Sequence, residues 1–293
     1  MKKHLIAFSL SALVAGCNSM PSGPTTQTSQ GAGAGVARYL AWYEGDLQTA
    51  YQVNREVAGS RLSELEAKQP SMEDTDAYLE YLSLIDAAGK HDIAGKKIKE
   101  FLVKNPEDKR GVFLLAVHYW RTNKKELSSY FLTQLEKDEK FPWKSLLLNN
   151  LGMMALQDKN RLLAIDYFQK ATKEQPATAA PFVNLGALYL QSRSFGPAQP
   201  LFERARQLDE DFEDAHVGLG IALEGQGKFD EAAKVYSEYL SAHPEAMTVA
   251  YNQATLLGNR LGRKEEASQL MLRYIQRGGK ETAKAQEIIQ NWR

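Results

Sequence analysis

The sequence has 293 residues, and its 36 Lys and Arg residues balance 36 Asp and Glu residues, so the formal net charge is zero. A chain without net charge has no overall field that attracts nucleic acid or an acidic surface. A single cysteine excludes a disulfide within the chain. The length suffices for one large domain or for an elongated array of repeats.

Residues 1–16 have the pattern of a secretory signal peptide. Two lysines form a positive head, an apolar run covers 5–15, and Gly16 precedes the lone Cys17. The apolar run is too short to cross a bilayer, which takes about 20 residues. In an oxidising compartment an odd thiol is either a hazard or a site of modification.

The sequence Val14-Ala15-Gly16-Cys17 resembles the lipobox of bacterial lipoproteins. The resemblance implies cleavage before Cys17, diacylation of its thiol and a third acyl chain on the new amino group. Together the three acyl chains anchor the protein stably, since one acyl chain alone binds a membrane only marginally. In the family an Asp after the cysteine retains the protein in the inner membrane. Asn18 therefore implies that the protein is anchored in the outer membrane and faces the periplasm. The alternative to a lipobox is an ordinary signal peptide that happens to contain a cysteine.

The next two segments lead into the folded part of the chain. Residues 17–36 carry no charge and are rich in Ser, Thr, Gln, Gly and Pro, so they predict a flexible linker. Such a linker has a root-mean-square span of about 25 Å. Residues 37–74 resemble a degenerate helical repeat around Gly45 and Ala50.

Internal repetition is the strongest signal in the sequence. Each unit has a Leu-Gly pair in an apolar helical pattern, and an alanine begins a second such pattern after a short break. Proline ends a helix, and Pro176 and Pro244 close two of the units. Glycine tolerates the positive φ of a tight turn, which predicts turns at Gly89, Gly227 and Gly262. Three features recur every 34 residues, at Gly152, Gly186 and Gly220, at Ala164, Ala198 and Ala232, and at Phe168, Phe202 and Tyr236.

These residues resemble the tetratricopeptide repeat (TPR), a helix–turn–helix unit of this period. The resemblance covers roughly 75–280 and implies an all-α superhelical solenoid of about six repeats, five clear and one degenerate. Ala94 and Ser128 continue the alanine position upstream, and Ala267 continues it downstream. Glu210 at a closing-proline position and the spacing of 36 from Ser128 to Ala164 depart from the pattern.

The last segment, 281–293, predicts a helix that caps the array. Its apolar residues recur at helical spacing among charged ones, at Ala285, Ile288, Ile289 and Trp292. A terminal repeat needs a polar-backed lid because each repeat buries its apolar face only against neighbours. Docking of a partner on this helix is the alternative.

No catalytic constellation is found in the sequence. HExxH, CxxC, GxSxG and phosphate-loop motifs are absent, so no enzyme, metal site or cofactor is predicted. The histidines after the signal lie in different units at different repeat positions, which predicts that they are scattered. His216 replaces a bulky core residue and is expected to be packed. The acidic run 209–214 lacks the spacing of a calcium loop and favours a helix N-terminus.

In the TPR family the concave groove is lined by fixed positions of each first helix. Carboxamides at these positions can both donate to and accept from an extended peptide, and apolar residues between them form sockets. Lys and Arg are nearly absent here, which disfavours a clamp for a terminal carboxylate. The alternative is that Asn150 and Asn184 are satisfied within the scaffold. The mapped groove residues are Asn149, Asn150, Met153, Val183, Asn184, Ala187, Gln191, Val217, Ile221, Glu224, Asn252, Gln253, Leu256 and Arg260.

The resemblance to TPR lipoproteins implies a non-enzymatic adaptor that binds envelope proteins and assists assembly of a surface machine. Similar lipoproteins act with the secretin of type IV or Tad pili or in gliding-motility complexes. A scaffold for peptidoglycan hydrolases is the alternative function. An enzyme with an unseen site and a homo-oligomer that stacks through its N-terminal units are further alternatives. No nucleic-acid partner is expected.

Overall fold

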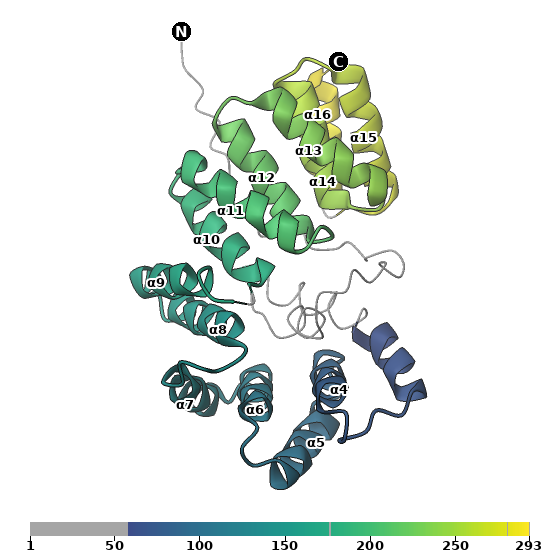
Figure 1. The fold of residues 1–293 in the computed structure, drawn as a ribbon. Helices are drawn as coiled ribbons and strands as arrows, with labels where there is room; N and C mark the ends of the chain where they lie inside the picture. Colours follow the sequence, from purple (N-terminus) through teal and green to yellow (C-terminus); the bar gives the residue numbers. More distant parts are fainter. Residues whose placement is uncertain (1–57, 176, 280, 293) are drawn as a thin grey trace.

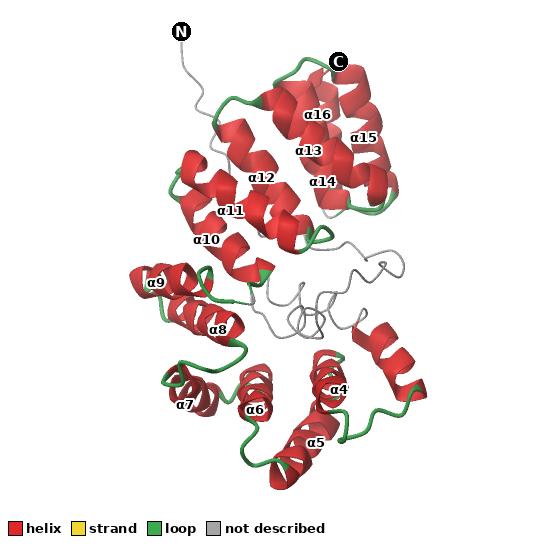
Figure 2. Ribbon diagram, viewed as in Figure 1, coloured by secondary structure: helices red, strands yellow, loops and turns green. Residues whose placement is uncertain are grey.

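The computed structural model describes residues 58–175, 177–279 and 281–292, and all regular elements in this part of the chain are helices (Figure 2). A helix over 58–67 comes first. The others are α4 (Thr75–Ala87), α5 (His91–Lys104), α6 (Lys109–Arg121), α7 (Lys125–Glu136), α8 (Lys144–Gln157), α9 (Arg161–Ala171), α10 (Ala179–Gln191), α11 (Phe195–Leu208), α12 (Glu213–Gly225), α13 (Phe229–Ala242), α14 (Met247–Asn259), α15 (Lys264–Gln276) and α16 (Thr282–Trp292).

The helices from α4 to α15 form six antiparallel hairpins that stack into a curved array (Figure 1). The first helices of successive hairpins contact one another at four places. The contacts join α4 to α6, α8 to α10, α10 to α12, and α12 to α14. These helices form an inner layer, and α5, α7 and α9 lie outside it (Figure 1). The fold is the predicted all-α superhelical solenoid. The described array holds one more clear hairpin than the five expected.

Glycines of the first helices allow each hairpin to close around an aromatic ring. A Cβ added at Gly152 would lie 2.5 Å from the Phe168 ring, and one at Gly186 would lie 2.8 Å from the Phe202 ring. Gly220 meets Tyr236 in the same way. The ring therefore packs against the glycine of its own hairpin. Of these three rings, Phe202 also meets a glycine of the following hairpin, Gly218.

Each of the six hairpin turns has one residue in the left-handed conformation, and this residue is glycine in only half of them. Gly89, Gly227 and Gly262 have φ values of 80°, 78° and 68°, which confirms the predicted turns. The other three turns place a side chain in this region, where Cβ meets backbone atoms. Those residues are Asn123, Lys159 and Arg193, with φ values of 59°, 58° and 54°.

The spacing of 36 between Ser128 and Ala164 has a structural reason in the connection between α7 and α8. This connection covers residues 137–143 and carries Phe141, which is 3% exposed. The Phe141 ring packs against Phe113 with centroids 5.8 Å apart. The longer connection thus adds a buried ring to the core.

The helix α16 covers the last hairpin. Ala285, Ile289 and Trp292 are buried, and Ile288 is partly buried against the same core. The Trp292 indole N–H donates to the Asn259 side chain at 2.7 Å. Its charged residues remain on the outer side, as a lid on a repeat array requires.

Several sequence predictions lie outside the described residues. They are the signal segment 1–16, Cys17, the linker 17–36, most of the degenerate repeat 37–74 and the closing Pro176. Within the described part of the chain, no helix is both long enough and apolar enough to cross a membrane.

Candidate functional site

Three asparagines of the predicted groove form a hydrogen-bonded row between α8 and α10. Asn149 and Asn150 are fully buried, and Asn184 is 1% exposed. The Asn184 amide donates to the Asn149 side-chain oxygen at 2.8 Å, and the Asn149 amide donates to the Asn150 oxygen at 3.2 Å. Because these amides join two first helices, they contribute to the stacking of the hairpins.

The other mapped positions divide into buried and accessible side chains. Met153, Val183, Ala187, Val217, Gln253 and Leu256 are buried. A buried side chain offers little surface to a partner, even when its helix belongs to the inner layer. Gln191, Ile221, Glu224 and Asn252 are half-buried, and Arg260 is exposed. Binding of a partner at these positions stays a prediction.

Two of the accessible members, Gln191 and Arg260, are held by contacts with neighbouring hairpins. The Arg161 guanidinium donates to the Gln191 side chain at 2.5 Å and to the Leu188 carbonyl at 2.6 Å. The Arg260 guanidinium lies over the Phe229 ring, 5.6 Å from its centroid. Gln191 and Arg260 therefore present ordered polar groups, which reduces the entropy lost when a partner binds.

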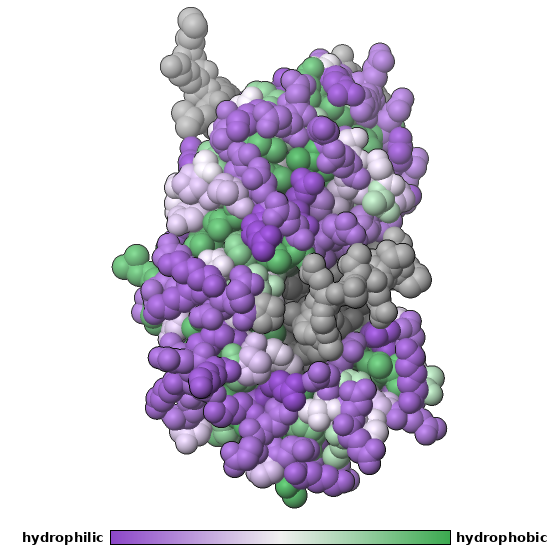
Figure 3. Space-filling view, in the orientation of Figure 1, coloured by the Kyte–Doolittle hydropathy of each residue, from purple (hydrophilic) through white to green (hydrophobic). Residues whose placement is uncertain are grey.

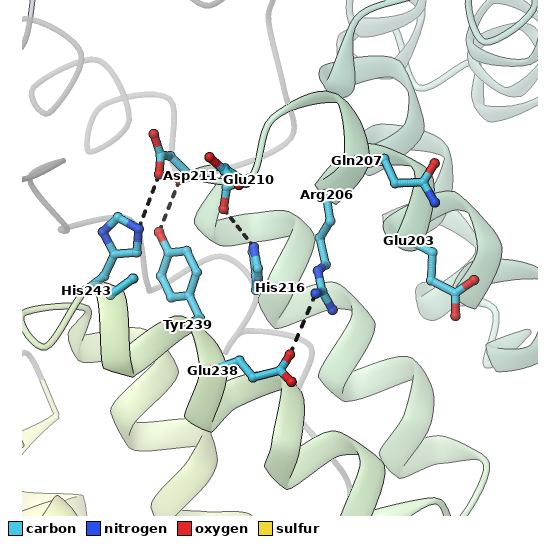
Figure 4. A pocket seen from close by; sticks show the side chains of 10 residues that line it. Glu203, Arg206, Gln207, Glu210, Asp211, His216, Glu238, Tyr239 and His243 are labelled. Atoms are coloured by element: carbon cyan, nitrogen blue, oxygen red, sulfur yellow. Dashed lines mark hydrogen bonds and ion pairs between the residues drawn. The ribbon is translucent and has the colours of Figure 1, made fainter. Parts of the chain in front are cut away.

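A pocket of about 630 Å³ lies between α11 and α13, beside the connection 209–212 (Figure 4). Sequence reasoning missed this pocket. The available signal was a pair of histidines, His216 and His243, that both follow the acidic run 209–214 in the sequence. The pocket is lined by Glu203, Arg206, Gln207, Glu210, Asp211, His216, Glu238, Tyr239, Ala242 and His243.

Three rings form one wall of this pocket. The Tyr239 ring lies between His216 and His243, with centroids 4.3 and 4.4 Å away. The Tyr239 hydroxyl donates to the Asp211 carbonyl at 3.1 Å, and His216 Nε2 lies 2.9 Å from the Glu210 carbonyl (Figure 4). The rings thus attach α12 and α13 to the connection that follows α11.

Charge in the pocket is mainly negative. Burial lowers the pKa of His216 to about 4, so this ring is neutral at pH 7. Burial also raises the pKa of Tyr239, with smaller contributions from Glu213 and Asp211. Arg206 lies 3.9 Å from Glu238, and His243 Nε2 lies 3.3 Å from Asp211. A His–carboxylate pair can orient a base, but no Ser, Thr or Cys lines the pocket to act as its nucleophile.

The structure corrects the expectation that the histidines are scattered. His216 and His243 share the pocket wall, and the His91 and His118 rings have centroids 6.3 Å apart beside Asp86. Stacking of helices places the end of one next to the start of another, so residues at different repeat positions can meet. His216 itself is buried, as predicted.

Comparison with known proteins places this geometry in a family of repeats. Residues 183–247 and 217–282 match the tetratricopeptide repeat. Residues 183–282 therefore contain tetratricopeptide repeats. The two matches together cover α11 to α15 and most of α10, whereas the hairpin with Gly152, Ala164 and Phe168 lies outside them. TPR folds generally serve as protein-interaction scaffolds, and nothing in the comparisons indicates an enzymatic activity.

Solved TPR structures share the fold at low sequence identity. The Cut9–Hcn1 hetero-tetramer of the APC/C superposes with a TM-score of 0.60 at 15% identity, over 83% of this chain and 48% of that chain. Pseudomonas aeruginosa PilF gives 0.59 at 16% identity, over 74% and 95%. PilW, a type IV pilus biogenesis factor, gives 0.53 at 18% identity, over 72% and 94%. At such identities the likeness concerns the fold alone.

The chain is also similar in sequence to a curated protein. Superkiller protein 3 of Schizosaccharomyces pombe is 30% identical over 122 residues, which is 41% of this chain and 8% of that protein. The chain thus spans less than a tenth of the length of this relative, and about half of the Cut9–Hcn1 chain.

Proposed function

We propose that the chain is a non-enzymatic, lipid-anchored TPR adaptor of the bacterial cell envelope that binds protein partners along its inner layer. The first helices that stack from α8 to α14 carry this proposal, because Gln191 and Arg260 present ordered polar groups there. The pattern ending at Cys17 supports a lipid anchor and the outer membrane, facing the periplasm. Three acyl chains would hold the array at that membrane.

We propose further that the partner belongs to a surface machine, such as the secretin of a type IV or Tad pilus or a subunit of a gliding-motility complex. The fold that the chain shares with the pilus biogenesis factor PilW supports this assignment. The structure of YrrB, described as a TPR protein with an unusual peptide-binding site, supports peptide binding; it has a TM-score of 0.52 at 19% identity.

Metabolic labelling with an alkyne-bearing fatty acid tests the anchor. The wild-type chain is expected to incorporate the label and to fractionate with outer membranes. Cys17→Ala removes the only thiol, so both the label and the membrane fraction should be lost. Labelling of the Cys17→Ala variant, or an unlabelled wild-type chain, would contradict the anchor and leave partner binding to be judged separately.

Site-specific photo-crosslinking in cells tests the partner surface. A photo-reactive residue at Gln191 or Asn252 is expected to give adducts with an envelope protein, identified by mass spectrometry. The control position is Lys234 on α13, whose side chain is 77% exposed and which is not among the mapped groove residues.

The identity of the adduct decides between the machines. A secretin or motility subunit supports the proposed function, whereas a peptidoglycan hydrolase replaces it with the cell-wall scaffold. Equal adducts from Lys234, or none from Gln191 and Asn252, would show that the inner layer is not the binding surface.

A further inference from the structure

A compact polar cluster joins the first two hairpins of the array. Asp86 lies in the last turn of α4, His91 begins α5, and His118 lies in the last turn of α6. The Asp86 side chain is 3% exposed and that of His118 is 8% exposed, whereas His91 keeps 26%. The cluster is therefore enclosed by protein but accessible to a small ion beside His91.

Both imidazoles face the same carboxylate oxygen. His91 Nδ1 lies 2.8 Å and His118 Nδ1 lies 2.9 Å from Asp86 Oδ1. The three potential ligand atoms all lie within 4.8 Å of one another. Arg121 Nη1 contacts the other oxygen, Oδ2, at 3.0 Å. The side of the carboxylate that faces the histidines is thus separate from the side that faces the arginine.

Two glycines permit this arrangement. Gly89, at φ 80°, reverses the chain between α4 and α5 and brings His91 back to Asp86. Gly95 on α5 leaves room for the second ring, because a Cβ there would lie 2.7 Å from His118 Nε2. Contact of α6 with both α4 and α5 then completes the cluster.

We propose that Asp86, His91 and His118 bind a divalent transition-metal ion of the Zn²⁺ class. Two imidazole nitrogens and one carboxylate oxygen are common ligands of Zn²⁺, and three protein ligands leave a fourth position for water. With bonds of about 2.1 Å in a tetrahedral site, neighbouring ligand atoms are about 3.4 Å apart. The two N···O distances are about half an ångström shorter than this. A small outward movement of the rings therefore admits the ion, provided that each neutral imidazole binds it through Nδ1 and carries its proton on Nε2.

The charges of the cluster bear on the strength of binding. Arg121 holds Oδ2 and so orients the ligand, as outer partners of metal sites do. Its positive charge also repels the ion, so we expect weaker binding than at a site without an arginine.

Metal titration of the full chain, purified in detergent and stripped with a chelator, tests the site. Equilibrium dialysis against Zn²⁺ should show one bound ion per chain. Co²⁺ in place of Zn²⁺ should give the visible absorption bands of a four-coordinate, tetrahedral ion. His91→Gln should weaken binding at least tenfold, because one of three ligands is lost. Zn²⁺ should also raise the Tm of the wild-type chain, since it binds only the folded state.

His243→Gln is the matched control, because His243 also lies beside a carboxylate but outside this cluster. It should bind Zn²⁺ like the wild-type chain. His91 is partly exposed, so its variant should remain folded, which circular dichroism verifies. Equal Zn²⁺ binding by wild-type chain and the His91→Gln variant would overturn the proposal. So would a loss of binding in His243→Gln as large as that in His91→Gln. Absence of binding to the wild-type chain would leave the cluster a hydrogen-bonded network only.

Discussion

Single glycines control how closely the two helices of a hairpin approach. Tyr236 is fully buried beside Gly220, and its hydroxyl donates to Glu224 at 3.0 Å. Gly196 is the opposite case, because a Cβ at this position of α11 meets nothing within 4 Å. The two glycines therefore separate the effect of packing from the effect of helix propensity.

Gly220→Ala is expected to destabilise the protein by about 1–3 kcal/mol, because the new methyl group overlaps the Tyr236 ring. Gly196→Ala should instead stabilise it by up to about 1 kcal/mol, since alanine is the better helix former. Urea unfolding followed by circular dichroism measures both. An unchanged free energy of unfolding in Gly220→Ala would mean that the two helices of the hairpin can move apart without loss of stability.

A buried carboxyl group makes stability depend on pH. Glu213 is 8% exposed, and burial raises its pKa from 4.5 to about 8, with a smaller contribution from Asp214. The folded state thus keeps a proton that the unfolded state releases above about pH 4.5. Stability contributed by this group is full below that pH and is lost as the pH rises through about 8.

Glu213→Gln is expected to remove this loss, because glutamine cannot ionise. The Tm of the variant relative to the wild-type chain should therefore increase between pH 5 and pH 8. Differential scanning calorimetry at several pH values measures it, with the exposed Glu203→Gln as control. A Tm difference that does not change with pH would show that Glu213 ionises freely in the folded state.

At the scale of elements, the left-handed turn residues distinguish the hairpins. Lys159 joins α8 and α9 with φ 58°, and Gly227 joins α12 and α13 with φ 78°. A side chain in this conformation costs roughly 1–2 kcal/mol, whereas glycine adopts it readily. Part of that gain is offset by the greater freedom that glycine gives to the unfolded chain.

Lys159→Gly is accordingly expected to raise the free energy of unfolding by up to about 1 kcal/mol. Gly227→Ala should lower it by a similar amount, although its Cβ has open space around it. Thermal unfolding of the two variants beside the wild-type chain tests the pair. Destabilisation by Lys159→Gly would show that the lysine side chain makes a contact that outweighs the strain.

The hairpins were predictable from sequence because their small and aromatic residues meet within one unit. Gly152 and Phe168 keep a fixed separation along the chain, so the repeat period reports their contact. Contacts between units leave no such signal. The pocket beside His216 and the cluster around Asp86 depend on how successive helices stack, and no local motif encodes that angle. Burial of Asn149 likewise follows from stacking of α8 against α10.

At the scale of the whole molecule, the core divides into two hydrophobic clusters. One extends from 58 to α10 and the other from α10 to α16, so α10 contributes to both. Each hairpin contacts mainly its neighbours, as in other repeat arrays, where stability is a sum of units and interfaces. Damage at one end should therefore spread through the nearest hairpin and fade toward the other end.

Trp292→Ala tests this one-dimensional behaviour. The indole is 6% exposed, packs against Gly258 of α14 and donates to Asn259, so its loss should cost about 3–5 kcal/mol locally. Hydrogen exchange followed by mass spectrometry should show faster exchange in α14–α16 and unchanged exchange in α4–α7. Faster exchange throughout the array would instead show that α10 couples the two clusters into one cooperative unit. Such coupling would make the inner layer a rigid surface, and a partner would then bind it without ordering separate hairpins.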